Sequence, residues 1–161
     1  EQMHSYIEEK YGKTELDTEF LTRFSQGIPK MADDIISDPD FEPIRRQAFK
    51  MLVPLLSKHR ISAYAVTEFL ENNKEKAELI LNLWQSFLRD ILLMQNDAKA
   101  LTVTADMNEE LSKLASRLPD NCCIIALERL IVAKNMLRRY VNLHVLGLNL
   151  SFSIKNSIYS R

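Results

Sequence analysis

The side chains best suited to catalysis or metal binding are scattered along this chain. The three histidines, His4, His59 and His144, fall in three different predicted regions, and none belongs to a zinc-binding helix motif. Neighbouring carboxylates such as Asp33-Asp34 and Glu109-Glu110 point about 100° apart on a helix, which favours solvated faces over an acid–base pair. No glycine-rich phosphate-binding motif occurs. The sequence therefore predicts no catalytic residue, no metal site and no cofactor in this chain.

The two cysteines, Cys122 and Cys123, are adjacent within an apolar run. No C-x-x-C motif or nearby histidine completes a set of metal ligands, so we expect small buried side chains in a reducing compartment. The sequence contains neither a signal peptide nor an apolar span of 18 residues. We therefore expect a cytoplasmic protein without a membrane partner. Because the chain opens on Glu1 within a helical pattern, we also expect it to be part of something longer.

Two polar pairs stand out within apolar segments. Arg89 and Asp90 are adjacent on a predicted helix, where neighbours do not face each other, so each should contact a different neighbouring helix. They are either surface residues at the edge of an apolar face or contacts to a partner. Arg138 and Arg139 form a basic pair, but without interleaved aromatic residues they make a poor site for nucleic acid.

The composition is that of a folded helical protein. Of 161 residues, 46% are hydrophobic and 27% charged, and only 3 are Gly and 5 are Pro. The net charge of −1 argues against a general nucleic-acid binder. The charge is uneven, however: residues 1–44 carry 4 basic and 11 acidic side chains, whereas residues 45–161 carry 17 and 11. This asymmetry indicates two parts with different surroundings.

The segment Lys74–Gln95 organises the predicted fold. Its apolar residues recur every three or four positions, and a second apolar line runs beside the first. It also contains Trp84, the only tryptophan, which is an anchor of large buried area. We predict a central helix that neighbours contact on more than one side, within an all-α fold.

Helix start and stop signals divide the rest of the chain. Thr14, Ser62, Asp106 and Asn142 are the predicted caps, Pro54 is expected to kink its helix, and a domain boundary is placed near Asp38–Phe41. The remaining predicted helices cover Glu1–Tyr11, a segment from Thr14, Pro29–Ser37, Ile44–Ser57, Ser62–Asn72, Asp106–Leu118, Asn121–Tyr140 and Leu143–Asn156. Because residues 143–154 contain no Asp, Glu, Lys or Arg, that last helix is either the innermost of a bundle or part of a subunit interface.

Three stretches resemble one family in its own order. W-x-x-F-L-R-D-I-L-L-M, starting at Trp84, resembles a helix in the collar domain of bacterial clamp-loader delta-prime subunits. S-Q-G-I-P-K-M-A (Ser25–Ala32) is similar to the start of the last lid helix of AAA+ ATPases. R-R-Y-V-N-L-H-V-L-G-L-N-L, from Arg138, resembles the end of the collar domain.

The segment that resembles the AAA+ lid differs from the family pattern at one position. In active AAA+ members the residue before the final Ala is commonly an arginine that reaches the nucleotide γ-phosphate, after the glycine and proline that here are Gly27 and Pro29. Met31 occupies that position and offers no charge to a phosphoryl-transfer reaction. Lys30, the neighbouring cation, lies about 100° round the helix from Met31 and so points elsewhere. The departure fits delta-prime, which typically hydrolyses no ATP itself.

The resemblance implies an AAA+ lid of three short helices at residues 1–40 and a helical collar domain at 41–161. It implies a non-catalytic part of the DNA polymerase III clamp loader that assembles with gamma/tau and delta subunits. The full complex, not this fragment, would use ATP to load the sliding clamp on primed DNA. The residues we predict at the protein interface are Arg89, Asp90, Arg138, Asn142, Leu143 and His144.

Three alternatives remain open at this point. The same region of a gamma/tau-type subunit is the nearest, and Met31 with the W-x-x-F-L-R-D order favours delta-prime over it. An unrelated helical adaptor that binds a peptide in a groove would also use spare apolar surface. An all-helical enzyme would need converging titratable groups, which the predicted helices do not bring together.

Overall fold

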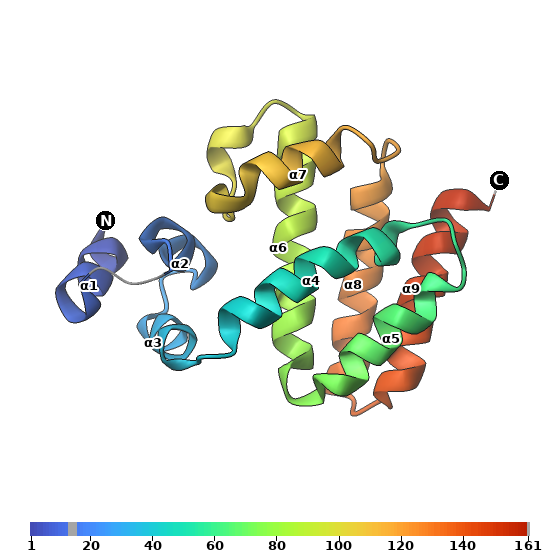
Figure 1. Ribbon diagram of the computed structural model, residues 1–161, viewed down its shortest axis with the longest axis horizontal. Coiled ribbons are helices and arrows are strands. Elements are labelled where there is room, and N and C mark those ends of the chain that lie inside the picture. Colours follow the sequence, from blue (N-terminus) through green and yellow to red (C-terminus); the bar gives the residue numbers. More distant parts are fainter. Residues whose placement is uncertain (13–15, 161) are drawn as a thin grey trace.

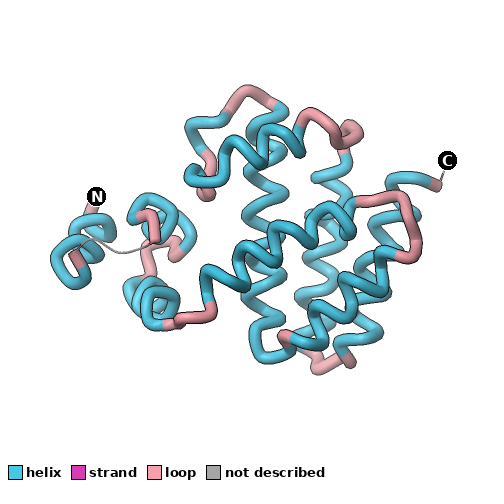
Figure 2. Tube along the Cα trace, viewed as in Figure 1, coloured by secondary structure: helices cyan, strands magenta, loops and turns pink. Residues whose placement is uncertain are grey.

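The computed structural model describes residues 1–12 and 16–160, and in these ranges regular structure is helical throughout (Figures 1 and 2). The prediction of an all-α fold is confirmed. Short 3-10 turns, η1 (Lys74–Lys76), η2 (Lys99–Leu101) and η3 (Ala105–Met107), lie between some of the α-helices. The α-helices of the described residues are α1 (Gln2–Tyr11), α2 (Thr18–Phe24), α3 (Pro29–Ser37), α4 (Phe41–Leu56), α5 (Ser62–Asn72), α6 (Ala77–Gln95), α7 (Asn108–Ala115), α8 (Cys122–Arg138) and α9 (Leu143–Tyr159).

The helix α6 is central, as its apolar pattern predicts. It contacts α4, α5, α7 and α8, and in Figure 1 α4 crosses in front of it. Trp84 is fully buried, and its indole N–H donates a hydrogen bond of 2.8 Å to the carbonyl oxygen of Ala48 on α4. Since a buried indole N–H without an acceptor would be costly, this bond fixes how α4 crosses α6.

Several helix ends differ from the predictions. Helix α4 begins at Phe41, three residues before the predicted start, because Pro43 falls in the first turn, where a missing N–H costs nothing. Ser62 does not cap α5; its hydroxyl donates to the carbonyl oxygens of Pro54 and His59. Helix α7 begins at Asn108, and Asp106 makes no capping bond to it.

The predicted cap at Thr14 lies outside the described residues. Helix α2 begins at Thr18, and its cap is Asp17, whose carboxylate accepts a 2.9 Å hydrogen bond from the backbone N–H of Phe20.

The C-terminal end of α4 is closed by side chains from α9. Pro54 lies within the last turn of α4, which ends at Leu56. The buried ammonium of Lys155 donates to the carbonyl oxygens of Pro54 and Ser57 at 2.7 and 2.8 Å, and to that of Leu55 at 3.3 Å. A cation suits the negative end of a helix dipole and satisfies carbonyls that have no partner within the helix. Burial lowers the pKa of Lys155 to about 8.

Helices α5 and α9 approach each other closely at Gly147. A β-carbon at Gly147 would lie 2.8 Å from the hydroxyl oxygen and 2.9 Å from the Cα of Thr67. Both residues are buried. The absence of a side chain at Gly147 therefore sets the distance between these two helices.

Helices α1 to α3 form a group beside the larger bundle, joined to it at the start of α4 (Figure 1). The two parts share one continuous apolar core, in which Phe41 of α4 stands 6.1 Å from Phe20 and 6.2 Å from Phe24 of α2, ring centre to ring centre. This packing shows why three short helices can be stable here. The division into a lid at 1–40 and a collar domain at 41–161 stays a prediction.

Candidate interaction surface

The predicted residues around the start of α9 do lie together. The carboxamide oxygen of Asn142 accepts hydrogen bonds from the backbone N–H of His144 and Val145, at 2.8 and 3.4 Å, so the predicted cap is confirmed. His144 is exposed, with its ring 3.3 Å from the carboxylate of Glu71 on α5. Leu143 is half-buried and packs against the core. Of these residues, Asn142 and His144 offer polar atoms at the surface.

The pair in α6 separates into an exposed and a buried residue. Arg89 is exposed, as an interface residue must be. Asp90 is fully buried, and its carboxylate accepts hydrogen bonds from the backbone N–H of Val103 and Thr104, at 3.0 and 2.7 Å, and from the Thr104 hydroxyl. The side chain of Asp90 therefore holds the segment between η2 and η3 onto α6, and it is not at the surface for a partner to contact.

A second buried charge, which the sequence does not reveal, joins α2, α4 and η3. The guanidinium of Arg45 on α4 is buried and makes two hydrogen bonds to the carboxylate of Asp106, at 2.6 and 2.9 Å, with Glu42 at 3.2 Å. It also lies 4.0 Å from the centre of the Phe20 ring. Although burial lowers the pKa of Arg45, the bonds to Asp106 raise it above its ordinary value. Arg23 of α2 adds a bond to the carbonyl oxygen of Thr102.

In the N-terminal helices, Met31 is half-buried and packs against the core, whereas Lys30 is exposed. Asp33 is partly exposed, with 28% of its side chain open to solvent, and it is also a structural contact. Its carboxylate accepts hydrogen bonds from Tyr6, Tyr11 and Lys10, at distances of 2.7 to 3.1 Å. Lys10 and the tyrosines hold the pKa of Asp33 below its usual value. Asp33 thus ties α3 to α1.

A stripe of exposed aliphatic side chains lies on α8. At about 100° per residue, Ile124, Glu128 and Ile131 fall on the side opposite the buried Ala126 and Leu130. The large aliphatic side chains on or beside this stripe are substantially exposed: Ile124 43%, Ile131 59% and Val132 46%. Exposed β-branched side chains grouped on one helix mark a surface suited to binding another protein.

This surface, which we call the α8 face (Ile124, Ile131, Val132, Arg138 and Tyr140), ends on an unusual residue. Tyr140 is 96% exposed and has a positive φ of 57°. The backbone N–H of Tyr140 donates to the carbonyl oxygen of Leu137, and the backbone N–H of Val141 donates to the carbonyl oxygen of Met136. These two bonds form a helix-ending motif in which the position of Tyr140 is usually occupied by glycine. Aromatic residues and arginine are typical anchors of protein interfaces. The α8 face therefore combines aliphatic area with an aromatic and a basic anchor.

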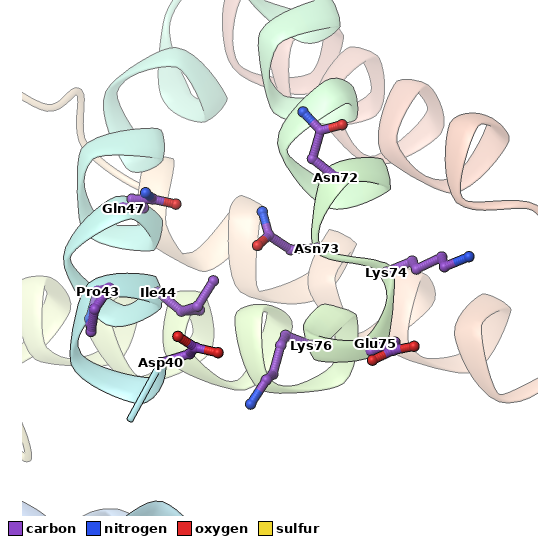
Figure 3. Close-up of a pocket in the computed structure, with 9 residues that line it drawn as sticks. All are labelled: Asp40, Pro43, Ile44, Gln47, Asn72, Asn73, Lys74, Glu75 and Lys76. Carbon is purple, nitrogen blue, oxygen red and sulfur yellow. The ribbon is translucent and has the colours of Figure 1, made fainter. Parts of the chain in front are cut away.

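Hollows elsewhere are open and lined by both polar and apolar side chains. The one in Figure 3, of about 490 Å³, lies between the start of α4 and the end of α5. There Gln47 and Asn73 point toward one another, while Lys74 points away. Beside it, a hydrogen bond from Lys76 lowers the pKa of Asp38. This mixture of amides and opposite charges forms no group of catalytic type.

Within residues 1–12 and 16–160, no group of three or more His, Cys, Asp or Glu side chains is arranged to hold a metal ion. Cys122 and Cys123 are buried, and burial raises the pKa of their thiols to about 11 and about 12. No helix in the described ranges is both long enough and apolar enough to span a membrane.

Comparison with known proteins gives one result. The family described as "DNA polymerase III, delta subunit, C terminal" matches residues 39–150, which is more than half of the chain. Comparisons with curated proteins and with solved structures give no match.

Proposed function

The chain belongs to the family of C-terminal domains of the DNA polymerase III delta subunit, a clamp-loader family, and on that premise we propose that it is a non-catalytic, delta-prime-type assembly module. In this proposal residues 41–161 form a collar domain that binds gamma/tau and delta subunits. The complex then loads the sliding clamp on primed DNA, whereas this chain supplies rigid helices and contact surface. Family membership removes the unrelated adaptor from the alternatives.

The non-catalytic part of the proposal is supported by Met31. An arginine at that position could reach a nucleotide, but Met31 packs into the apolar core and leaves no cation there to stabilise phosphoryl transfer. Lys30, the neighbouring cation, is exposed on α3. The same observation favours a delta-prime-type subunit over a gamma/tau-type subunit.

The observation that carries the assembly role is the α8 face. Helix α8 spans 17 residues, and its outer side presents Ile124, Ile131 and Val132 to solvent next to Arg138 and Tyr140. Such side chains gain free energy when a partner covers them, at about 25 cal/mol for each Å² of apolar surface buried. The predicted interface residues Asn142 and His144 lie just beyond its end, at the start of α9.

The test is size-exclusion chromatography of this chain mixed with the gamma/tau or delta collar domain of the same organism. We expect a mixed complex that is lost when Ile131→Glu and Val132→Glu are combined. Both side chains are exposed, so the variant should fold; Leu137 and Leu143 are unsuitable because they pack against the core. Leu101→Glu, at an aliphatic residue 63% exposed in η2, is the matched control.

Circular dichroism and thermal unfolding must first show that both variants retain the fold. If the control and the double variant bind equally well, the α8 face is not the interface. If the unaltered chain forms no complex with either partner at about 50 µM, a concentration that captures even weak contacts, the assembly role itself is refuted.

A further inference from the structure

A long stretch of the chain has no acidic residue. Between Pro43 and Thr67 there are five Lys or Arg residues and one His, but no Asp or Glu. Residues 141–161 contain no Asp or Glu either. These two segments are in contact, because α9 packs on both α4 and α5. The structure therefore joins two acid-free segments on one side of the bundle.

The side chains of these segments gather where α4 turns into α5. Lys50 and Val53 lie on the side of α4 opposite the buried Ala48 and Leu52. The 2.8 Å bond from the Ser62 hydroxyl to the Pro54 carbonyl places the beginning of α5 against the end of α4. Lys58, Arg60 and Ile61 lie in the loop between them.

Helix α9 contributes Phe152, against which side chains of this surface pack. The Tyr64 ring meets the Phe152 ring edge to face, with centroids 6.4 Å apart. The Arg60 guanidinium lies 5.3 Å from the Phe152 ring centre. We call Lys50, Val53, Lys58, Arg60, Ile61 and Tyr64 the basic surface.

The basic surface is exposed, and within residues 1–12 and 16–160 Lys50, Lys58 and Arg60 form no ion pair with an acidic side chain. Val53 is 59%, Tyr64 58% and Ile61 79% exposed. Among the residues described, Arg46 pairs with Glu42, and Arg45 is buried against Asp106, so neither belongs to this surface. The first acid along α5 is Glu68, one turn beyond Tyr64. Cations, two aliphatic side chains and an aromatic ring are thus presented together.

We propose that the basic surface binds an acidic polypeptide segment that also carries apolar side chains. Carboxylates would pair with Lys50, Lys58 and Arg60, and the apolar side chains would cover Ile61 and Val53. Single-stranded nucleic acid fits less well, because one face of Phe152 is already covered by Arg60 and aliphatic side chains provide no base stacking. This inference does not depend on the proposed collar assembly, since the exposed residues of the basic surface belong to α4, α5 and the loop between them and not to α8.

The experiment is fluorescence anisotropy with labelled probes at moderate and high salt. The probe is a short peptide of repeated Glu-Glu-Leu-Phe units; peptides of Glu-Glu-Ser-Ser and Lys-Lys-Leu-Phe units and an oligo-dT of equal length are compared with it. We expect the first peptide to bind best. Lys58→Glu combined with Arg60→Glu should weaken its binding about tenfold or more, because attraction becomes repulsion.

The matched control reverses the same amount of charge elsewhere, with Lys99→Glu and Lys113→Glu in η2 and α7, where both residues are exposed. It should change binding less than about twofold, because salt screens the attraction of a peptide to charges with which it makes no contact. Ile61→Ser, at a side chain with no folding role, should weaken the acidic apolar peptide but not the Glu-Glu-Ser-Ser peptide.

Three results would overturn the inference. In the first, oligo-dT binds at least as tightly as the acidic apolar peptide, and its binding is lost in the Lys58→Glu and Arg60→Glu variant. The basic surface would then be a nucleic-acid site. The two charge-reversal variants could behave alike. No probe could bind at about 100 µM. The Ile131→Glu and Val132→Glu variant should bind the peptide normally, so failure of the collar proposal is distinguishable from failure of this one.

Discussion

The buried ion pair between Arg45 and Asp106 can be tested quantitatively by a double-mutant cycle. Asp106→Asn leaves the buried guanidinium with only Glu42, at 3.2 Å, as a charged partner. Removing one partner of a buried pair costs about 3–5 kcal/mol. Because Glu42 remains, we expect the lower end, a loss of about 3 kcal/mol in the free energy of unfolding.

Replacing the cation instead should cost much less. Arg45→Met keeps an unbranched apolar side chain against Phe20 and leaves Asp106, whose side chain is 27% exposed, able to bind water. It also removes the buried Nε–H of Arg45, which has no acceptor among the described residues. We therefore expect a change within about 1 kcal/mol. In the Arg45→Met background, Asp106→Asn should then cost less than about 0.5 kcal/mol.

Urea unfolding followed by circular dichroism measures all four free energies. The predicted coupling between the two positions is about 2 kcal/mol or more. The reasoning is refuted if Asp106→Asn costs the same in both backgrounds to within about 0.5 kcal/mol, or if Arg45→Met is the more harmful single change.

Three further predictions concern other parts of the fold. Gly147→Ala should lower the free energy of unfolding, measured with urea, by about 1–2 kcal/mol. The cost of overpacking against the Thr67 backbone should exceed the gain of about 1 kcal/mol in helix propensity. A more stable variant would contradict the 2.9 Å approach between the added β-carbon and the Thr67 Cα. The pKa of Lys155 falls from 10.5 to about 8 on folding, so between these pH values the unfolded chain binds more protons than the folded chain. Raising the pH through that range should therefore stabilise the natural chain relative to Lys155→Met. Unfolding of both proteins at several pH values measures this difference, and parallel stability profiles would disprove the prediction. The thiol pKa values of Cys122 and Cys123 are about 11 and about 12, so little reactive thiolate is present at pH 8. Both thiols should therefore react with a thiol reagent at this pH at least about a hundredfold more slowly in the native chain than in the unfolded chain. Equal rates would show that the two thiols are accessible in the folded protein.

Much of the helical framework follows from local chemistry. Apolar residues at three- and four-residue steps mark α6 because such spacing makes one face of any helix apolar, whatever the helix packs against. Helix α8 differs, since its apolar residues Ile124 and Ile131 lie opposite the buried Ala126 and Leu130. Asn142 is recognisable as a cap because its side chain bonds N–H groups only two and three residues away. Pro43 lies inside the first turn of α4, where proline and a helix start are compatible.

The polar side chains could not be placed in the same way. The local pattern predicts that Asp106 caps the next helix, but in the structure its carboxylate bonds Arg45, which is 61 residues away. The sequence also places Asp90 among the predicted interface residues, yet its carboxylate bonds the backbone of Val103 and Thr104 in the interior. The choice between a local cap, a buried partner and the surface depends on which segments are adjacent in space.

Local patterns are therefore sufficient to predict that the chain is helical, where most helices begin and end, and that α6 is central, because these properties depend on periodicity and on bonds within a few residues. The burial of Arg45 and Lys155 and the exposure of Ile131 and Ile61 depend instead on how the helices pack. A charge is buried where distant segments supply its partners, and an apolar side chain is exposed where none of the described segments packs over it.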